Sequence, residues 1–208
     1  MFELSAFARE VHQNAIEHGW WEKRRSAAEI RALIHSEWSE ALEEARAGRP
    51  MVWHRCMDNT NGPAICEKQT ECPCKLDSWE SDCPAYDQKP EGVAVELIDG
   101  CIRILDYLAY IGKADDDLDI EDCVLFARHE AEHGVDMPVD EMDVSDVFDT
   151  LHLFVTASRN EPSERFHLMC AVGLAFEWIR LQGLNPETII QQKHRYNKTR
   201  PYKHGKKF

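Results

Sequence analysis

Apolar residues recur every three or four positions along most of the chain, and this spacing predicts an all-α helical bundle. Between residues 30 and 42, for example, Ile30, Ile34, Trp38 and Leu42 follow the pattern, and the stretch contains no glycine or proline. Glycines, prolines and capping residues mark where the helices should begin and end. Seven helices are expected, at 2–18, 27–47, 93–111, 119–133, 143–158 and 164–182 and from 184 onward.

Acidic residues interrupt the apolar pattern of two of these helices. On the helix at 27–47, with about 100° per residue, Glu37 falls inside the apolar sector and Glu40 on its edge. On the helix at 93–111, Glu96 and Asp99 belong to a single polar stripe, which taken alone is typical of a narrow solvated face. Two helices that each carry two acids three residues apart can, however, bring four carboxylates to one point between them.

Four such carboxylates require a positive partner. Two unit charges ~4 Å apart repel by about 4 kcal/mol at an effective dielectric near 20. No Lys or Arg occupies the neighbouring positions 33, 34, 41 or 44, so either a distant base or a cation must balance the acids. An all-oxygen ligand set favours a hard divalent ion, Mg²⁺ or Mn²⁺.

The Glu-x-x-Glu of residues 37–40 followed by the Glu-x-x-Asp of residues 96–99 resembles a known signature. It is similar to that of the all-α nucleoside triphosphate pyrophosphatases, the MazG-like and dimeric dUTPase-like superfamily. His12-x-Asn14, Gly19-Trp20-Trp21 and the run 33–37 resemble the N-terminal half of that family, and residues 193–205 resemble the tail of its MazG-like members. The chain departs from the family in the roughly 55 residues that separate Glu40 from Glu96.

The resemblance implies a Mg²⁺-dependent pyrophosphohydrolase that cleaves nucleoside triphosphates to a monophosphate and pyrophosphate. It implies that the four acids bind metal and that one glutamate, Glu40 by resemblance, activates the attacking water. The expected metal-binding and catalytic residues are Glu37, Glu40, Glu96 and Asp99. The expected substrate-binding residues are Lys193, Asn197 and Arg200 for phosphates, His12 and Asn14 for sugar or base, and Tyr202 in the basic tail.

Charge argues against a general nucleic-acid binder, because the chain of 208 residues has a formal net charge of −14. The bases are concentrated at one end: residues 193–207 hold seven Lys or Arg, two His and no acid. This run is either a solvated terminus or a segment that binds polyphosphate. The N-terminus lacks the apolar run of a signal peptide, and no stretch is apolar enough to span a membrane, so a cytoplasmic protein is expected.

Residues 51–90 hold five of the eight cysteines and few aliphatic side chains, so they cannot build a core alone. Disulfides are rare in the cytoplasm. Structural zinc held by four of these thiolates, or by three and His54, is therefore expected, with an iron–sulfur cluster or free or redox-active thiols as alternatives. The five cysteines are Cys56, Cys66, Cys72, Cys74 and Cys83. Three others, Cys101, Cys123 and Cys170, lie on apolar helical faces and are expected to be small core residues.

The second half of the chain resembles a degenerate repeat of the first half. The run at 94–103 reappears 77 residues later at 171–180, and two runs in the first helix reappear 119 and 115 residues later. The offsets of 119 and 115 residues exceed the offset of 77 residues by about 40, which is about the length of the Cys-rich segment. We therefore expect an active unit at 1–114, with an insertion at about 50–90, and a degenerate unit at 115–208, packed as one globular domain. In this register the four acids become Phe154, Ala157, Gly173 and Phe176.

Three rival functions fit parts of the pattern. One is a narrower enzyme of the same class, specific for dUTP, dCTP or a guanosine alarmone. Another is a nucleotide-binding module without turnover, whose Cys-rich segment serves as a zinc-dependent interaction arm or redox sensor. A third is a helical scaffold with solvated acids. A homo-oligomer is compatible with each of them.

Overall fold

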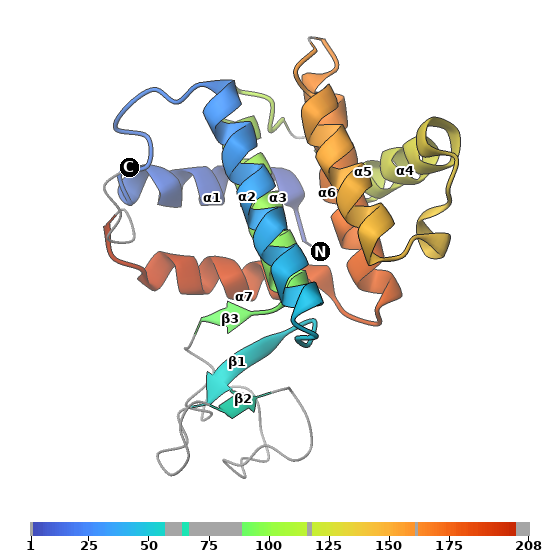
Figure 1. Ribbon diagram of the computed structural model, residues 1–208. Coiled ribbons are helices and arrows are strands. Elements are labelled where there is room, and N and C mark those ends of the chain that lie inside the picture. The colour runs from blue at the N-terminus through green and yellow to red at the C-terminus, as the bar shows by residue number, and fades with distance from the viewer. Residues whose placement is uncertain (1, 57–63, 67–88, 116–117, 161, 203–208) are drawn as a thin grey trace.

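The computed structural model describes residues 2–56, 64–66, 89–115, 118–160 and 162–202 (Figure 1). These residues are mostly helical, which confirms the all-α class. The helices of the described chain are α1 (Leu4–Glu17), α2 (Ala27–Arg46), α3 (Val93–Tyr110), α4 (Ile120–Glu130), α5 (Val144–Ala157), α6 (Glu164–Leu181) and α7 (Pro186–Thr199). A π-helical turn, η1 (Ala131–Val135), continues α4, and a 3₁₀ turn, η2 (Val139–Glu141), precedes α5.

The helix starts follow the capping signals in the sequence. The side chain of Ser26 accepts a hydrogen bond from the Glu29 amide at the start of α2. Asp143 and Asp146 form a reciprocal capping box at the start of α5. At α7, Asn185 caps the helix and Pro186 occupies its first turn, as the sequence predicts.

A small antiparallel sheet lies beside the helices, in the order β2-β1-β3. Its strands are β1 (Trp53–Cys56), β2 (Ala64–Cys66) and β3 (Pro90–Glu91). The expectation of an irregular Cys-rich insertion is therefore wrong at these strands, because β1 pairs with β3 directly before α3. The indole nitrogen of Trp53 donates to Glu44 on α2 at 2.7 Å, and His54 lies 3.0 Å from Gln192 on α7. The sheet thus ties the loop between α2 and α3 to both α2 and α7.

The zinc expectation lies outside the part of the chain that the structure describes. The positions concerned are the side chains of Cys56 and Cys66, and Cys72, Cys74 and Cys83 within residues 67–88. The three helical cysteines, in contrast, are buried free thiols, as expected: Cys101, Cys123 and Cys170.

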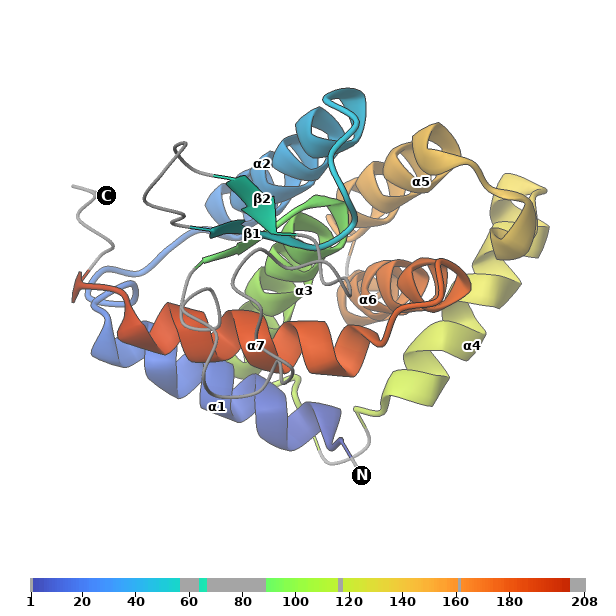
Figure 2. The ribbon, with the colours of Figure 1, turned by 90° about the horizontal axis from the view of Figure 1, so that it is seen from below.

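Helix α3 is the centre of the first half of the fold. It is buried on most of its surface and contacts α1, α2, α6 and α7, between which it lies in Figure 2. Helix α2 approaches it closely at Gly100, where an added Cβ would lie 2.0 Å from the indole nitrogen of Trp38. That nitrogen lies 3.3 Å from the carbonyl oxygen of Leu97, to which it donates. The absence of a side chain at Gly100 therefore sets the spacing between α2 and α3.

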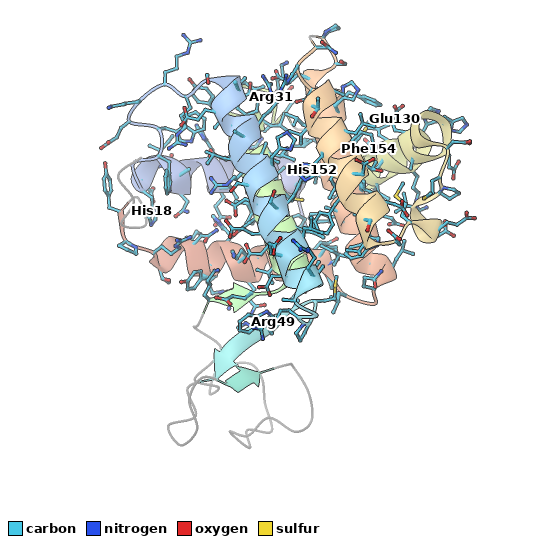
Figure 3. All side chains as sticks on the ribbon, in the orientation of Figure 1. His18, Arg31, Arg49, Glu130, His152 and Phe154 are labelled. Carbon is cyan, nitrogen blue, oxygen red and sulfur yellow. The ribbon has the colours of Figure 1, made fainter. Side chains whose placement is uncertain are left out.

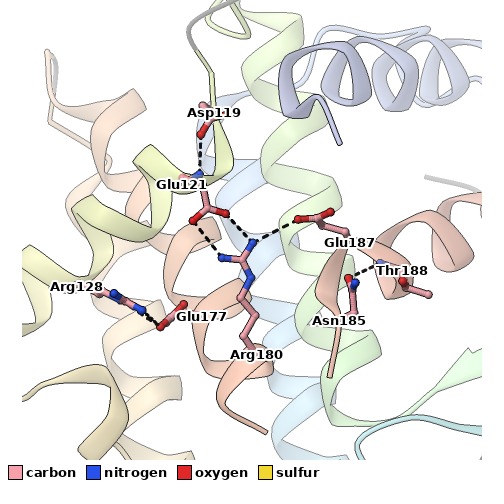
Figure 4. Close-up of polar contacts among 8 residues, drawn as sticks. All are labelled: Asp119, Glu121, Arg128, Glu177, Arg180, Asn185, Glu187 and Thr188. Carbon is pink, nitrogen blue, oxygen red and sulfur yellow. Dashed lines mark hydrogen bonds and ion pairs between the residues drawn. The ribbon is translucent and has the colours of Figure 1, made fainter. Parts of the chain in front are cut away.

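Helix α6 has the same central place in the second half. Helices α4 and α5 pack on it, while contacts between α2 and α5 and between α3 and α6 join the two halves. Arg180 on α6 pairs with Glu121 on α4 at 2.9 Å and with Glu187 on α7 at 3.4 Å (Figure 4). Arg128 and Glu177 form a second ion pair between α4 and α6. None of the helices in the described residues is both long and apolar enough to cross a membrane.

Candidate functional site

Helices α2 and α3 bring three of the four predicted acids together. One carboxylate oxygen from each of Glu37, Glu96 and Asp99 lies within 4.8 Å of the others. Glu37 and Glu96 are buried, and Asp99 is half-buried. The close approach at Gly100 explains the convergence. Glu37 directly precedes Trp38, and Glu96 and Asp99 directly precede the two residues of α3 that the Trp38 indole contacts, Leu97 and Gly100.

The fourth acid, Glu40, is exposed and lies outside this cluster of three. It lines the same cavity as the other three acids, however. Its charge also acts on the cluster, because it contributes to raising the pKa of Glu37. Glu40 therefore lies at the edge of the acidic cluster, one helical turn from Glu37.

Three bases already pair with the clustered acids. The ammonium nitrogen of Lys193, on α7, lies 2.8 Å from Asp99 Oδ2 and 3.8 Å from Glu96 Oε1. Arg103, one turn beyond Asp99 on α3, donates from Nε to Glu37 at 2.6 Å. Lys89, just before β3, lies 3.6 Å from Glu96. The sequence predicted that Lys193 would hold phosphates, whereas the structure places it against the carboxylates.

Burial disfavours the charged form of the acids. It raises the pKa of Glu96 to about 7, with Lys193 opposing the shift and Asp99 adding to it. Burial also raises the pKa of Glu37; the Arg103 guanidinium opposes this shift, and the charges of Asp99 and Glu40 add to it. A positive charge beside these carboxylates, from a base or from a bound cation, offsets this cost of burial.

Lys193 keeps its charge despite its burial. Loss of hydration alone would lower its pKa, but the charges of Asp99 and Glu96 outweigh that effect and raise its pKa above the ordinary value. Its side chain is 0% exposed. A charged ammonium is thus enclosed between α7 and the acids of α3.

A cavity of about 280 Å³ opens beside the acids, between α1, α2, α3 and α7. This volume is near the lower end of the range for small-molecule sites, roughly 300–1,000 Å³. Its walls combine apolar side chains, such as Val11 and Ile30, with aromatic and polar groups. The aromatic and polar lining residues include Asn14, Trp20, Trp21, Arg25, Asp106, Asn197 and Arg200.

The adjacent tryptophans have different surroundings. Trp21 stacks on Tyr110 with ring centroids 3.9 Å apart and donates to Asp106 at 2.9 Å, so it anchors α1 to α3. The guanidinium of Arg25 lies over the ring of Trp20, 5.2 Å from its centroid. Both side chains line the cavity, where a planar ligand group could contact them.

Three of the six predicted substrate-binding residues line the cavity: Asn14, Asn197 and Arg200. The amide oxygen of Asn197 is buried without a hydrogen-bond partner among the described residues. The carbonyl oxygen of Arg200 lies 3.0 Å from Nε2 of His18, whose position at the end of α1 is marked in Figure 3. The end of α1 thus fixes the end of α7 beside the cavity.

The other predicted contacts lie elsewhere. Lys193 faces the acids, as described above. His12 lies 2.6 Å from the half-buried carboxylate of Asp106 and is not among the residues that line the cavity. Tyr202 packs over Gly19 and donates to Glu22, so it also lies outside the cavity walls formed by the described residues.

Some site residues were missed by sequence reasoning. Arg103 and Asp106 continue the polar stripe of Glu96 and Asp99, so the signal for them was present, but their partners lie on other helices. Arg25 and Lys89 stand in segments without periodicity, and no sequence signal pointed to them.

No family profile matches the chain, and neither does any curated protein or solved structure.

Proposed function

We propose that this protein is a divalent-metal-dependent nucleoside triphosphate pyrophosphohydrolase of the all-α nucleoside triphosphate pyrophosphatase type. It would cleave the α–β phosphoanhydride to give a nucleoside monophosphate and pyrophosphate. The observation that carries the proposal is the meeting of Glu37, Glu96 and Asp99 within 4.8 Å, on the wall of a cavity that α7 also lines.

The ligand atoms fit a hard ion. The three acids offer only carboxylate oxygens, which suit Mg²⁺ or Mn²⁺ better than zinc. When bound, such an ion would neutralise phosphate oxygens and make a coordinated water more acidic. Glu37, Glu96 and Asp99 would hold the ion. Glu40, exposed at the edge of the cluster, would orient the attacking water and accept its proton.

The other walls of the cavity supply contacts for the rest of a nucleotide. Asn197 and Arg200 lie three residues apart at the end of α7 and offer donors that suit phosphate oxygens. Trp20, Asn14 and the apolar wall offer stacking and hydrogen-bonding groups for a base and its sugar. Which base is preferred depends on the shape of this part of the cavity.

We also propose that the two halves form a tandem in which α4, α5 and α6 are the degenerate copy of α1, α2 and α3. The packing supports this relation, because α1 and α2 pack on α3 in the way that α4 and α5 pack on α6. The counterparts of Glu37 and Asp99 in this register, Phe154 and Phe176, are buried apolar residues. The second unit then supports the active one without binding a metal.

Product analysis tests the proposal. Purified protein is incubated with each ribonucleoside and deoxyribonucleoside triphosphate, with Mg²⁺ or with EDTA, and both products are measured. We expect pyrophosphate and monophosphate in equal amounts, from at least one nucleotide, with Mg²⁺ only. Glu37→Gln should abolish turnover, whereas Glu43→Gln, on the exposed side of α2, should not. Nucleotide binding without Mg²⁺-dependent products would favour the non-catalytic binding module instead.

A further inference from the structure

Lys193 occupies the place where a cation is most needed. It is fully buried, and its nitrogen lies 2.8 Å from Asp99 and 3.8 Å from Glu96, the acids that the proposed ion would use. The charge of Glu37 also stabilises its protonated form. Without an ion, Lys193 therefore serves as the counter-charge of the acidic cluster, together with Arg103 and Lys89.

Lys193 would disfavour the binding of a free divalent ion at this site. The two positive charges of the ion would lie beside the ammonium and would draw Asp99 and Glu96 away from it. Because the side chain of Lys193 is 0% exposed, water cannot take over as its partner unless α7 moves. A buried charge that loses its partner is strongly destabilising.

An oligophosphate that binds together with the ion could replace the carboxylates as the anionic partner of Lys193. Lys193 lies one helical turn before Asn197, whose amide N–H₂ is a donor, and Arg200 follows directly after α7. Phosphate oxygens bound by these two residues could reach the ammonium if α7 moves, and they would replace the carboxylates that the ion takes. Asn197 and Arg200 would contact the same ligand, since both line the cavity.

We propose that Lys193 makes the site take its metal together with an oligophosphate, so that the ligand it selects is the metal–triphosphate complex and not the free ion. The proposal rests on the proposed function, because it takes the three acids as metal ligands. It adds a role for Lys193 that is opposite in sign for the two ligands: the residue weakens binding of the free ion and strengthens binding of the complex.

Calorimetric titration of the full-length protein tests this role without turnover. Mn²⁺ alone, and Mn²⁺ preloaded on inorganic tripolyphosphate, are titrated into the wild type, Lys193→Met and Lys198→Met. Lys198 is the matched control, because it removes the same charge from the same helix, but it is 47% exposed and pairs with Glu10. Lys193→Gln serves as a second variant, and circular dichroism verifies that each variant is folded.

For the wild type and Lys198→Met, we expect the complex to bind at least about tenfold more tightly than free Mn²⁺. For Lys193→Met, we expect free Mn²⁺ to bind at least about tenfold more tightly than in the wild type, since a nearby positive charge has been removed. Binding of the complex should also weaken in Lys193→Met, so the preference for the complex should shrink by more than this factor.

Two results would overturn the inference while leaving the metal site intact. One is that free Mn²⁺ binds Lys193→Met and the wild type equally well. The other is that the wild type binds free Mn²⁺ as tightly as the complex. If no variant binds Mn²⁺ in either form, the metal site fails, and the proposed function fails with it.

Discussion

His35 on α2 stacks face to face with His152 on α5, with their Nδ1 atoms 2.6 Å apart and their ring centroids separated by 4.8 Å. Figure 3 labels His152, between α2 and α5. The two residues are 117 positions apart, which is the offset that relates α2 to α5 in the proposed tandem. In a two-fold arrangement, only residues on the axis touch their own counterparts. The contact therefore supports a tandem with an internal two-fold relation, in which α2 and α5 meet on the axis.

The histidine contact predicts a loss of stability in mild acid. Burial lowers the pKa of His152 below 6.5, with Asp149 opposing the shift, so the folded chain holds this ring neutral. The stability that depends on the neutral ring is complete above the unfolded-state value of 6.5 and is lost as the pH falls from there towards the lower folded-state pKa. Melting temperatures between pH 7.5 and 5 measure the effect. The slope with pH should be smaller for His152→Gln, and an identical slope would contradict the role of this ring.

Gly100 sets the spacing of the two helices that carry the acids, and Gly100→Ala tests this. The added Cβ would lie 2.0 Å from the Trp38 indole, so α2 must move or Trp38 must change its rotamer. We expect a loss of about 1–3 kcal/mol in the free energy of unfolding, measured by urea denaturation. Binding of the Mn²⁺–tripolyphosphate complex should weaken as well, because the acids move apart.

The control for this variant is Gly134→Ala in η1. Its Cβ would meet only the flexible side chain of Glu130, at 3.4 Å. This variant should unfold within about 0.5 kcal/mol of the wild type, as is usual for surface substitutions. Equal stability of the two alanine variants would show that the contact at Gly100 is not tight.

Glu40 should act in the chemical step more than in metal binding, because it lies outside the cluster of three acids. Glu40→Gln is expected to lower kcat by about 10²–10⁴-fold, the usual contribution of a general base. Calorimetry should find its affinity for the Mn²⁺–tripolyphosphate complex within about threefold of the wild type. A large loss of affinity with little change in kcat would make Glu40 a metal ligand instead.

Arg200 should affect binding of the substrate at the phosphate end. Arg200→Gln removes a charged donor from the cavity wall, and KM should rise about tenfold or more. Arg195→Gln, an exposed position of the same helix, is the control and should leave KM within about twofold. Steady-state kinetics on the preferred nucleotide provides the comparison, and equal KM values for the two variants would remove Arg200 from the site.

Helical periodicity was sufficient to predict the helices and the meeting of Glu37 with Glu96 and Asp99. The period places side chains on a face, and Gly100 and Trp38 lie on the faces that meet. The strands at Trp53–Cys56 and Pro90–Glu91 were missed because they are short and pair across a long loop, so no local pattern marks them.

The partners of the charged residues were the least predictable part of the site. Arg103 pairs with Glu37 across 66 positions, and His12 with Asp106 across 94. Such pairs depend on how the helices pack, which spacing within one helix does not reveal. Lys193 shows the same effect: its type suggested a phosphate contact, and its place in the fold puts it against Asp99. The zinc expectation for the Cys-rich segment stays a prediction.

The central claim is that the acids of α2 and α3 support a metal-dependent cleavage, and pyrophosphate release by Glu96→Gln tests it most directly. Glu96 is buried in the cluster, and Gln keeps its size while removing its charge. With Mg²⁺ and the preferred nucleotide, we predict release at the wild-type rate for Glu43→Gln and at least about 100-fold slower release for Glu96→Gln. Release by Glu96→Gln at the wild-type rate, or release by the wild type that persists in EDTA, would contradict the account.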